Sequence, residues 1–278
     1  KKKDMRSPIC IKGKKTRCTR NVDCKARHQI QSAYEGIVSA NQKAIQQSVG
    51  NIWSARKMTS SQSTQVEYNG QPLKSLTRYY WRVKVYNQNN DASAWSKINF
   101  FETAMLDTKD WKAKWIGDDR TQFERDEDFY KDDRMPLLRK AFTATKPIAS
   151  ARLYICWLGY YEAYFNGKKT GDHVLDPGFT TYKKEVLYVT YDITAQLKQG
   201  KNVAGIMLTN GWYNPLPLRL FGRFNLRDVQ QTGRPCVKAE IHLQYNDGTS
   251  DIITTDESWK TAPGPVLLNN VYLGEKYD

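Results

Sequence analysis

The 278-residue sequence predicts an all-β chain made of two successive β-sandwiches. The first observation behind this fold class is that short runs alternating between apolar and polar residues recur along the chain, as they do in half-buried strands. The second is that the best helix candidate, residues 32–48, has no sustained apolar stripe at helical spacing. Many short strands separated by turn residues are typical of β-sandwiches and jelly rolls.

The first sandwich is expected over residues 28–104, after a basic and disordered terminus at residues 1–27. Within it, AYEGIVS alternates in the manner of a strand, and TRYYWRVKVYNQ does so more clearly. In the second of these segments, one face holds Tyr79, Trp81, Val83 and Val85 and the other holds Tyr80, Arg82 and Lys84. Turn residues follow at 87–91, and the next strand is expected over residues 96–101.

Residues 105–135 are expected to form a linker and a charged, solvated loop, and residues 136–278 the second sandwich. Asn166-Gly167 and Asp247-Gly248 mark tight hairpin turns, because these residue types tolerate positive φ. The strand-like runs of this part are residues 138–142, 151–158, 162–165, 186–191, 203–208, 237–245 and 251–255.

The formal net charge of +14 is unevenly distributed. Residues 1–27 contain eleven Lys or Arg and two Asp, a net of +9, which leaves +5 for the rest of the chain. An excess confined to one terminal stretch is typical of a solvated segment, so nucleic acid is not expected as a partner. No run approaches the ~18 apolar residues of a membrane-spanning helix, and no signal peptide is visible, so no membrane partner is expected either.

Two groups of residues are candidates for carbohydrate binding. Along residues 153–166, strand parity assigns the odd positions, including Trp157, to the core. The even positions alternate rings with hydrogen-bonding groups, the mixture that a pyranose and its hydroxyls need, at Tyr160, Glu162, Tyr164 and Asn166. The second group lies in loops that can approach the same end of the sandwich, at Asp172, Asp176, Trp212 and Tyr213. The alternative is that the exposed rings pack against a neighbouring domain.

Catalytic chemistry is not indicated by the residues themselves. Glycoside hydrolysis needs two carboxylates on either side of the scissile bond, and one of them usually has a raised pKa. Acidic residues are plentiful, but no spacing singles out such a pair. The three histidines and five cysteines are scattered, without the pattern of a catalytic triad or a zinc site. No catalytic residue and no metal ligand is therefore assigned.

Four segments carry a family resemblance. They are residues 66–103, LGYYEAYFNGKKTGDHVLDPGFTTY from Leu158, NGWY from Asn210, and TTDESWKTAPGPVLLNNVYLGEKYD from Thr254. The first resembles the closing strands of a fibronectin type III domain. The combination resembles the N-terminal part of bacterial α-L-rhamnosidases, glycoside hydrolase family 78. The resemblance implies a fibronectin type III-like sandwich followed by a jelly-roll, galactose-binding-like sandwich.

The resemblance also implies a function. In this family the catalytic acidic residues lie in a helical (α/α)₆ barrel after the β-domains, and no position of this chain matches them. The chain alone is therefore expected to be inactive, with rhamnose-containing glycans and its own C-terminal catalytic domain as partners. A bacterial, periplasmic or secreted location is expected. Some family sandwiches bind rhamnose with calcium, but no spacing here resembles a calcium loop, so no cofactor is assigned.

Two other functions stay open at this point. The chain can be a stand-alone carbohydrate-binding module that captures rhamnose-containing glycans. It can also be an adhesion or structural protein built from β-sandwiches, without sugar chemistry. A helical barrel with paired acidic residues, encoded directly after Asp278, would favour the enzyme over both.

Overall fold

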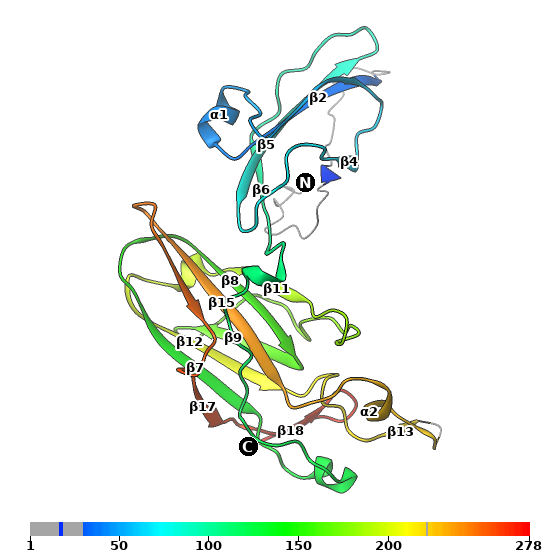
Figure 1. Ribbon diagram of the computed structural model, residues 1–278, viewed down its shortest axis with the longest axis vertical. Helices are drawn as coiled ribbons and strands as arrows, with labels where there is room; N and C mark the ends of the chain where they lie inside the picture. Colours follow the sequence, from blue (N-terminus) through cyan, green and yellow to red (C-terminus); the bar gives the residue numbers. More distant parts are fainter. Residues whose placement is uncertain (1–16, 19–29, 221) are drawn as a thin grey trace. The chain divides into compact units, whose positions relative to one another are not determined.

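The computed structural model describes residues 17–18, 30–220 and 222–278. The chain divides into two compact units, Lys1–Trp111 and Lys112–Asp278. The all-β prediction is confirmed, because the α-helices of the described ranges are the short α1 (Gln42–Gln46) and α2 (Leu226–Val229) (Figure 1). Within those ranges, no helix has the length and apolar character needed to cross a membrane.

The first unit contains a four-stranded and a two-stranded antiparallel sheet. The larger has the order β3–β2–β5–β6, with β2 at Gln31–Ser39, β3 at Trp53–Thr59, β5 at Arg78–Asn87 and β6 at Asn99–Glu102. The smaller pairs β1 (Arg17–Cys18) with β4 (Val66–Glu67), so two residues of the expected disordered terminus form a strand. The rest of that terminus lies outside the described residues. A short 3₁₀ turn, η1 (Thr108–Asp110), lies near the end of the unit.

The core of the first unit follows the alternation of its strands. Tyr79 of β5 is buried and stacks on Phe101 of β6, with ring centroids 5.5 Å apart. Trp81 and Val85, on the same face of β5, pack against the buried clusters of this unit. On the opposite face, the Lys84 ammonium forms an ion pair with Glu35 of β2 at 2.6 Å. The predicted division of β5 into an apolar and a polar face is therefore confirmed.

The second unit is a sandwich of two antiparallel sheets, of which Figure 1 shows β7, β9 and β12 in one layer and β8, β11 and β15 in the other. The five-stranded sheet has the order β10–β9–β12–β7–β17, with β7 at Pro136–Ala144, β9 at Tyr160–Phe165, β10 at Lys168–Lys169, β12 at Gly200–Thr209 and β17 at Lys260–Pro263. The four-stranded sheet has the order β11–β8–β15–β16, with β8 at Ile148–Leu158, β11 at Tyr188–Asp192, β15 at Cys236–Tyr245 and β16 at Ser250–Thr254. Smaller elements of this unit are η2 (Asp126–Tyr130), η3 (Thr194–Gln196), the pair β13 (Arg219–Leu220) with β14 (Phe224–Asn225), and the pair β18 (Val266–Asn270) with β19 (Gly274–Tyr277).

A corner at Gly159 connects β8 and β9, which belong to different sheets. Gly159 has a φ of 123°, and a Cβ at this position would lie 2.3 Å from the carbonyl oxygen of Thr209, so the corner requires glycine. The predicted core positions are confirmed, since all six odd-numbered side chains are buried, at Leu153, Ile155, Trp157, Tyr161, Ala163 and Phe165. Applying one strand parity across residues 153–166 treated them as a single strand system, which is wrong, because the chain changes sheet at this corner.

The segment expected as a linker packs in part on the second unit. The backbone N–H groups of Lys112 and Ala113 donate to the carboxylate of Glu240, whose side chain is fully buried. Ile116 then forms an isolated β-bridge with Val237. Residues 112–116 are therefore fixed to β15 through the Glu240 carboxylate and through the backbone hydrogen bonds between Ile116 and Val237.

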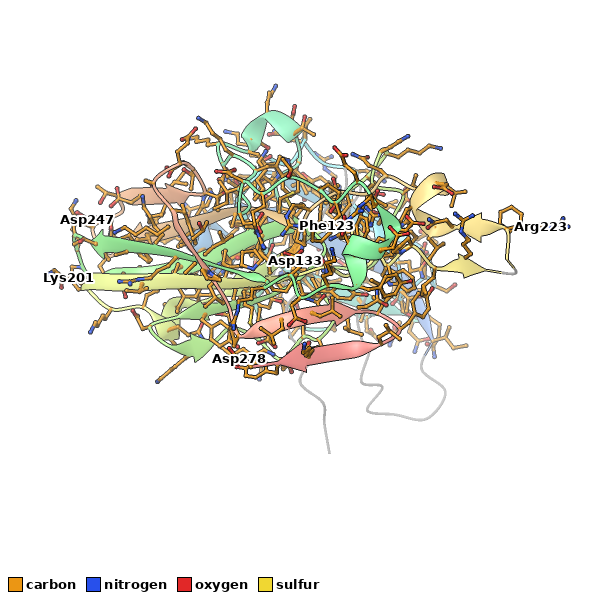
Figure 2. The ribbon with its side chains drawn as sticks, turned by 90° about the horizontal axis from the view of Figure 1, so that it is seen from below. Phe123, Asp133, Lys201, Arg223, Asp247 and Asp278 are labelled. Carbon is orange, nitrogen blue, oxygen red and sulfur yellow. The ribbon has the colours of Figure 1, made fainter. Side chains whose placement is uncertain are left out.

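The charged run that follows is also more structured than a solvated loop. It contains η2, which buries Phe129. Figure 2 labels Phe123, which precedes this turn in the sequence, and Asp133, which follows it. The Asp133 carboxylate accepts hydrogen bonds from the guanidinium of Arg234, at 3.0 and 3.1 Å, and is also paired with Arg120. Long-range pairing with Arg234 therefore orders Asp133, which the local sequence presents as part of a solvated run.

Candidate functional site

Six aromatic residues from four segments of the second unit form a group that we call the aromatic cluster: Tyr160, Phe179, Tyr182, Trp212, Tyr213 and Tyr272. Its centre is Trp212, whose ring centroid lies 5.9 Å from that of Phe179 and 5.6 Å from that of Tyr272. Tyr160 is close to it as well: burial raises the pKa of the Tyr160 hydroxyl, and the neighbouring Trp212 indole N–H lowers it in part. The structure thus brings together two predicted site residues, Tyr160 and Trp212, that the sequence placed in separate groups.

The cluster lies around the loop that follows β12. In Figure 2, Lys201 at the start of β12 lies at one end of the second unit, and Arg223 lies at the opposite end. Asn210 and Gly211 turn the chain directly after β12. The Asn210 backbone N–H donates to Oδ1 of Asn269 at 2.8 Å, and its side-chain amide donates to the Asn269 carbonyl at 3.1 Å. These buried hydrogen bonds give Trp212 a rigid backbone support.

The two rings of the NGWY loop have different environments. Trp212 is half-buried, and its neighbours Phe179 and Tyr272 are exposed over 54% and 49% of their surface. Tyr213 is buried, and its ring lies edge-on to that of Tyr182 at 5.4 Å. The sequence placed both rings in a loop available for binding, and this is wrong for Tyr213, because it packs into the sandwich core. Trp212, Phe179 and Tyr272 form the accessible part of the cluster.

Tyr160, Glu162 and Tyr164 lie on the outer face of β9, half-buried. The Glu162 carboxylate accepts hydrogen bonds from the Tyr164 hydroxyl, at 2.5 Å, and from the Lys169 ammonium. Although partial burial favours the neutral acid, these two hydrogen bonds hold the pKa of Glu162 below its ordinary value. The same hydrogen bond to Glu162, together with burial, raises the pKa of Tyr164 to about 12. Glu162 is thus ionised, and it fixes the ring of Tyr164.

Asn166 belongs to the tight turn rather than to this face. Its φ is 50°, and its side-chain amide donates to the Gln196 carbonyl at 2.9 Å and to Oδ1 of Asn202 at 3.0 Å. Its Oδ1 accepts from the backbone N–H of Val203. Because both the NH2 group and Oδ1 of its side chain form hydrogen bonds within the second unit, Asn166 stabilises the hairpin.

Asp172 and Asp176 lie in the loop between β10 and β11. The Asp176 carboxylate accepts a hydrogen bond from the Tyr191 hydroxyl at 2.9 Å and lies 2.5 Å from Nδ1 of His173. Burial, and then the Asp176 carboxylate, raise the pKa of Tyr191 to about 12. Asp172 is exposed. This polar group shares no residue with the aromatic cluster, although the same loop also supplies Phe179 and Tyr182.

Three members of the aromatic cluster were not predicted from the sequence: Phe179, Tyr182 and Tyr272. All three lie inside the segments that carry the family resemblance, but each meets Trp212 or Tyr213 through contacts distant in sequence. Among the residues that the structure describes, no group of three or more His, Cys, Asp or Glu is arranged to hold a metal ion.

Two family descriptions match this chain. "Alpha-L-rhamnosidase N-terminal domain" matches residues 146–278, and "Rha78A-like, N-terminal immunoglobulin domain" matches residues 2–107. An α-L-rhamnosidase of Formosa agariphila is 38% identical over 98% of this chain and 30% of its own length. One of an Alteromonas species is 33% identical over 89% of this chain and 26% of its own.

Two solved structures are similar to the whole chain. The α-L-rhamnosidase of Dictyoglumus thermophilum gives a TM-score of 0.87 at 34% identity, and that of Aspergillus terreus gives 0.80 at 28% identity. Each match covers 98% of this chain and 30% of the other protein. The chain therefore spans less than a third of the length of these relatives.

Proposed function

This chain belongs to the α-L-rhamnosidase family through its N-terminal domains, and from that premise we propose that it forms the non-catalytic N-terminal portion of such an enzyme. In this role it supports a C-terminal catalytic domain. It also binds rhamnose-containing glycans through the aromatic cluster. We further propose that the first unit is fibronectin type III-like and the second a jelly roll.

The glycan proposal rests on the accessible rings of the aromatic cluster around Trp212, whose loop is held in place by the buried hydrogen bonds of Asn210. A pyranose binds to aromatic faces through its apolar C–H surface, with polar groups at the rim for its hydroxyls. Phe179 and Tyr272 flank Trp212, and the Tyr160 side chain supplies a polar partner at its edge. Exposed apolar surface of this kind marks an interaction site on a monomer. A sugar therefore has both a stacking surface and hydrogen-bonding groups here.

Removing the central ring should weaken rhamnose binding without unfolding the unit. We expect Trp212→Ala to lower the affinity for L-rhamnose by on the order of 1 kcal/mol, about fivefold, because one stacked ring is lost. Binding near the millimolar range corresponds to only about 4 kcal/mol, so titration calorimetry on the whole chain would resolve this loss. Trp115→Ala is the matched control, because Trp115 is 42% exposed and takes part in none of the cluster's ring contacts.

The two variants separate sugar binding from domain packing. If both bind rhamnose as the wild type does, the cluster is not a rhamnose site. The better interpretation is then that the catalytic domain covers the exposed rings of the aromatic cluster.

A further inference from the structure

One cross-strand row on the outer face of the five-stranded sheet combines two cations, a glycine and an aromatic ring. Lys260 of β17 lies opposite Arg139 of β7, Arg139 lies opposite Gly205 of β12, and Gly205 lies opposite Tyr164 of β9. Residues opposite each other in antiparallel strands point to the same face. That face is the outer one, because successive residues of a strand point to opposite faces. The residues adjacent to the row are buried in the core, at Leu138 on β7, Ala204 on β12 and Phe165 on β9. We call these four residues the cationic row.

The two cations of the row have no counter-charge in the described part of the chain. Arg139 and Lys260 are both exposed and face each other in direct register. Like charges in this position destabilise a sheet. Among the described residues, no carboxylate forms an ion pair with either of them. The carboxylate on this face of β9, Glu162, is already occupied by Lys169 and by the Tyr164 hydroxyl. The pair is therefore available to an anionic group.

The glycine leaves an open position between the ring and the cations. A Cβ at Gly205 would have a single protein atom in ordinary contact, the Cβ of Tyr164 at 3.9 Å. Glycine inside a strand weakens it, and it often marks a place where a ligand approaches the backbone closely. Tyr164 and Arg139 lie two strand spacings apart, about 10 Å at the backbone. That width accommodates one sugar ring lying over Gly205.

We propose that the cationic row binds a sugar residue that carries an anionic group, either a carboxylate or a sulfate ester. The sugar ring lies over Gly205 against the ring of Tyr164, and its anionic group binds the side chains of Arg139 and Lys260. The hydrogen bond from Tyr164 to Glu162 fixes the orientation of the aromatic ring. The proposal rests on the proposed function in taking a glycan as the partner, but the row shares no residue with the aromatic cluster.

The test compares glucose derivatives that are neutral or anionic at C6. Methyl β-D-glucuronide and methyl β-D-glucoside are titrated into the whole chain by calorimetry, with glucose 6-sulfate as the second anion. We expect at least one of the two anions to bind about tenfold more tightly than the glucoside, because charge-assisted hydrogen bonds are stronger than neutral ones. Added salt should reduce this preference. Whichever anion binds more tightly identifies the group that the row recognises.

Variants of the row connect the binding to these residues. We expect Arg139→Gln and Lys260→Gln each to lower the affinity for the anionic sugar about tenfold. Without ligand, each should raise the Tm by about 1–3 °C, because the like-charge contact is relieved. Gly205→Val should block the charged and the neutral sugar alike. Lys201→Gln is the matched control, since Lys201 is an exposed lysine at the start of β12, remote in register from Gly205 (Figure 2).

Two results would overturn the proposal: neither anion binding more tightly than the glucoside, or full affinity for the anionic sugar in the Arg139→Gln and Lys260→Gln variants. These failures are separate from failure of the rhamnose site. Rhamnose binding that depends on Trp212, without a preference for anionic sugars, would support the proposed function and contradict the cationic row as a binding site. A preference for anionic sugars that depends on Arg139 and Lys260, without rhamnose binding, would support the cationic row and contradict the aromatic cluster as a rhamnose site.

Discussion

Trp157→Ala should lower the free energy of unfolding of the second unit by about 3–5 kcal/mol. The Trp157 side chain is completely buried in the sandwich core, and its ring lies 4.1 Å from that of Tyr161. Truncation leaves a cavity that a close-packed interior fills only in part. Urea unfolding followed by circular dichroism measures the loss.

Two further variants test whether packing is the cause. Trp157→Phe should cost much less, because it keeps most of the apolar volume. The indole N–H it removes has no hydrogen-bond partner within the described structure. Trp212→Ala should also cost much less than Trp157→Ala, since Trp212 is only half-buried. Equal stability of Trp157→Ala and the wild type would contradict the core assignment.

Arg234→Ala should destabilise the second unit by about 3 kcal/mol, because it leaves two poorly solvated carboxylates without their main partner. The Arg234 side chain is 9% exposed and lies between Asp118 and Asp133, whose side chains are 10% and 7% exposed. It donates to Asp118 at 2.9 Å and to Asp133 at 3.0 Å. Arg120, the other partner of both carboxylates, is 44% exposed and solvates them less effectively.

The effect of Arg234→Ala should depend on pH. Burial alone would raise the pKa of Asp118, but hydrogen bonds from Arg234 and Arg120 outweigh it and hold the pKa below its ordinary value. A carboxyl whose pKa is lower in the folded than in the unfolded state stabilises the fold above the unfolded pKa, about 3.9 for Asp, and loses this effect as pH falls. The stability difference between wild type and variant should therefore be large at pH 7 and shrink below about pH 4. An equal difference at both pH values would contradict this assignment.

The sequence predicted local features of the fold correctly because they have a local cause. The period of two in β8 and β9 assigned Trp157 and Phe165 to the core, and both are buried. Asn166 and Gly167 adopt positive φ, as their residue types indicated for a hairpin turn. The change of sheet at Gly159 was missed, because a sequence shows alternation within a strand but not the sheet to which the strand belongs.

Contacts between residues distant in sequence explain the other differences between the predicted and the observed structure. Asp133 was expected in a solvated loop, but its partner Arg234 lies 101 residues further along the chain. In the candidate site, the residue types of Tyr160 and Trp212 indicated sugar binding, while their proximity depends on how β9 and the loop after β12 fold together. Phe179 and Tyr272 were missed for the same reason.

The central proposal, that this chain does not cleave rhamnosides by itself, is tested most directly by incubating the purified chain with p-nitrophenyl α-L-rhamnoside. A glycosidase general acid needs a raised pKa. Within the described part of the chain, the acidic residues with shifted pKa values are shifted downward, as in Glu162 and in Asp128, whose pKa falls to about 2 through hydrogen bonds from Arg125 and Lys131. We expect no p-nitrophenolate release above the buffer blank. Turnover that survives repurification and disappears in Glu162→Gln or Asp176→Asn would contradict the claim.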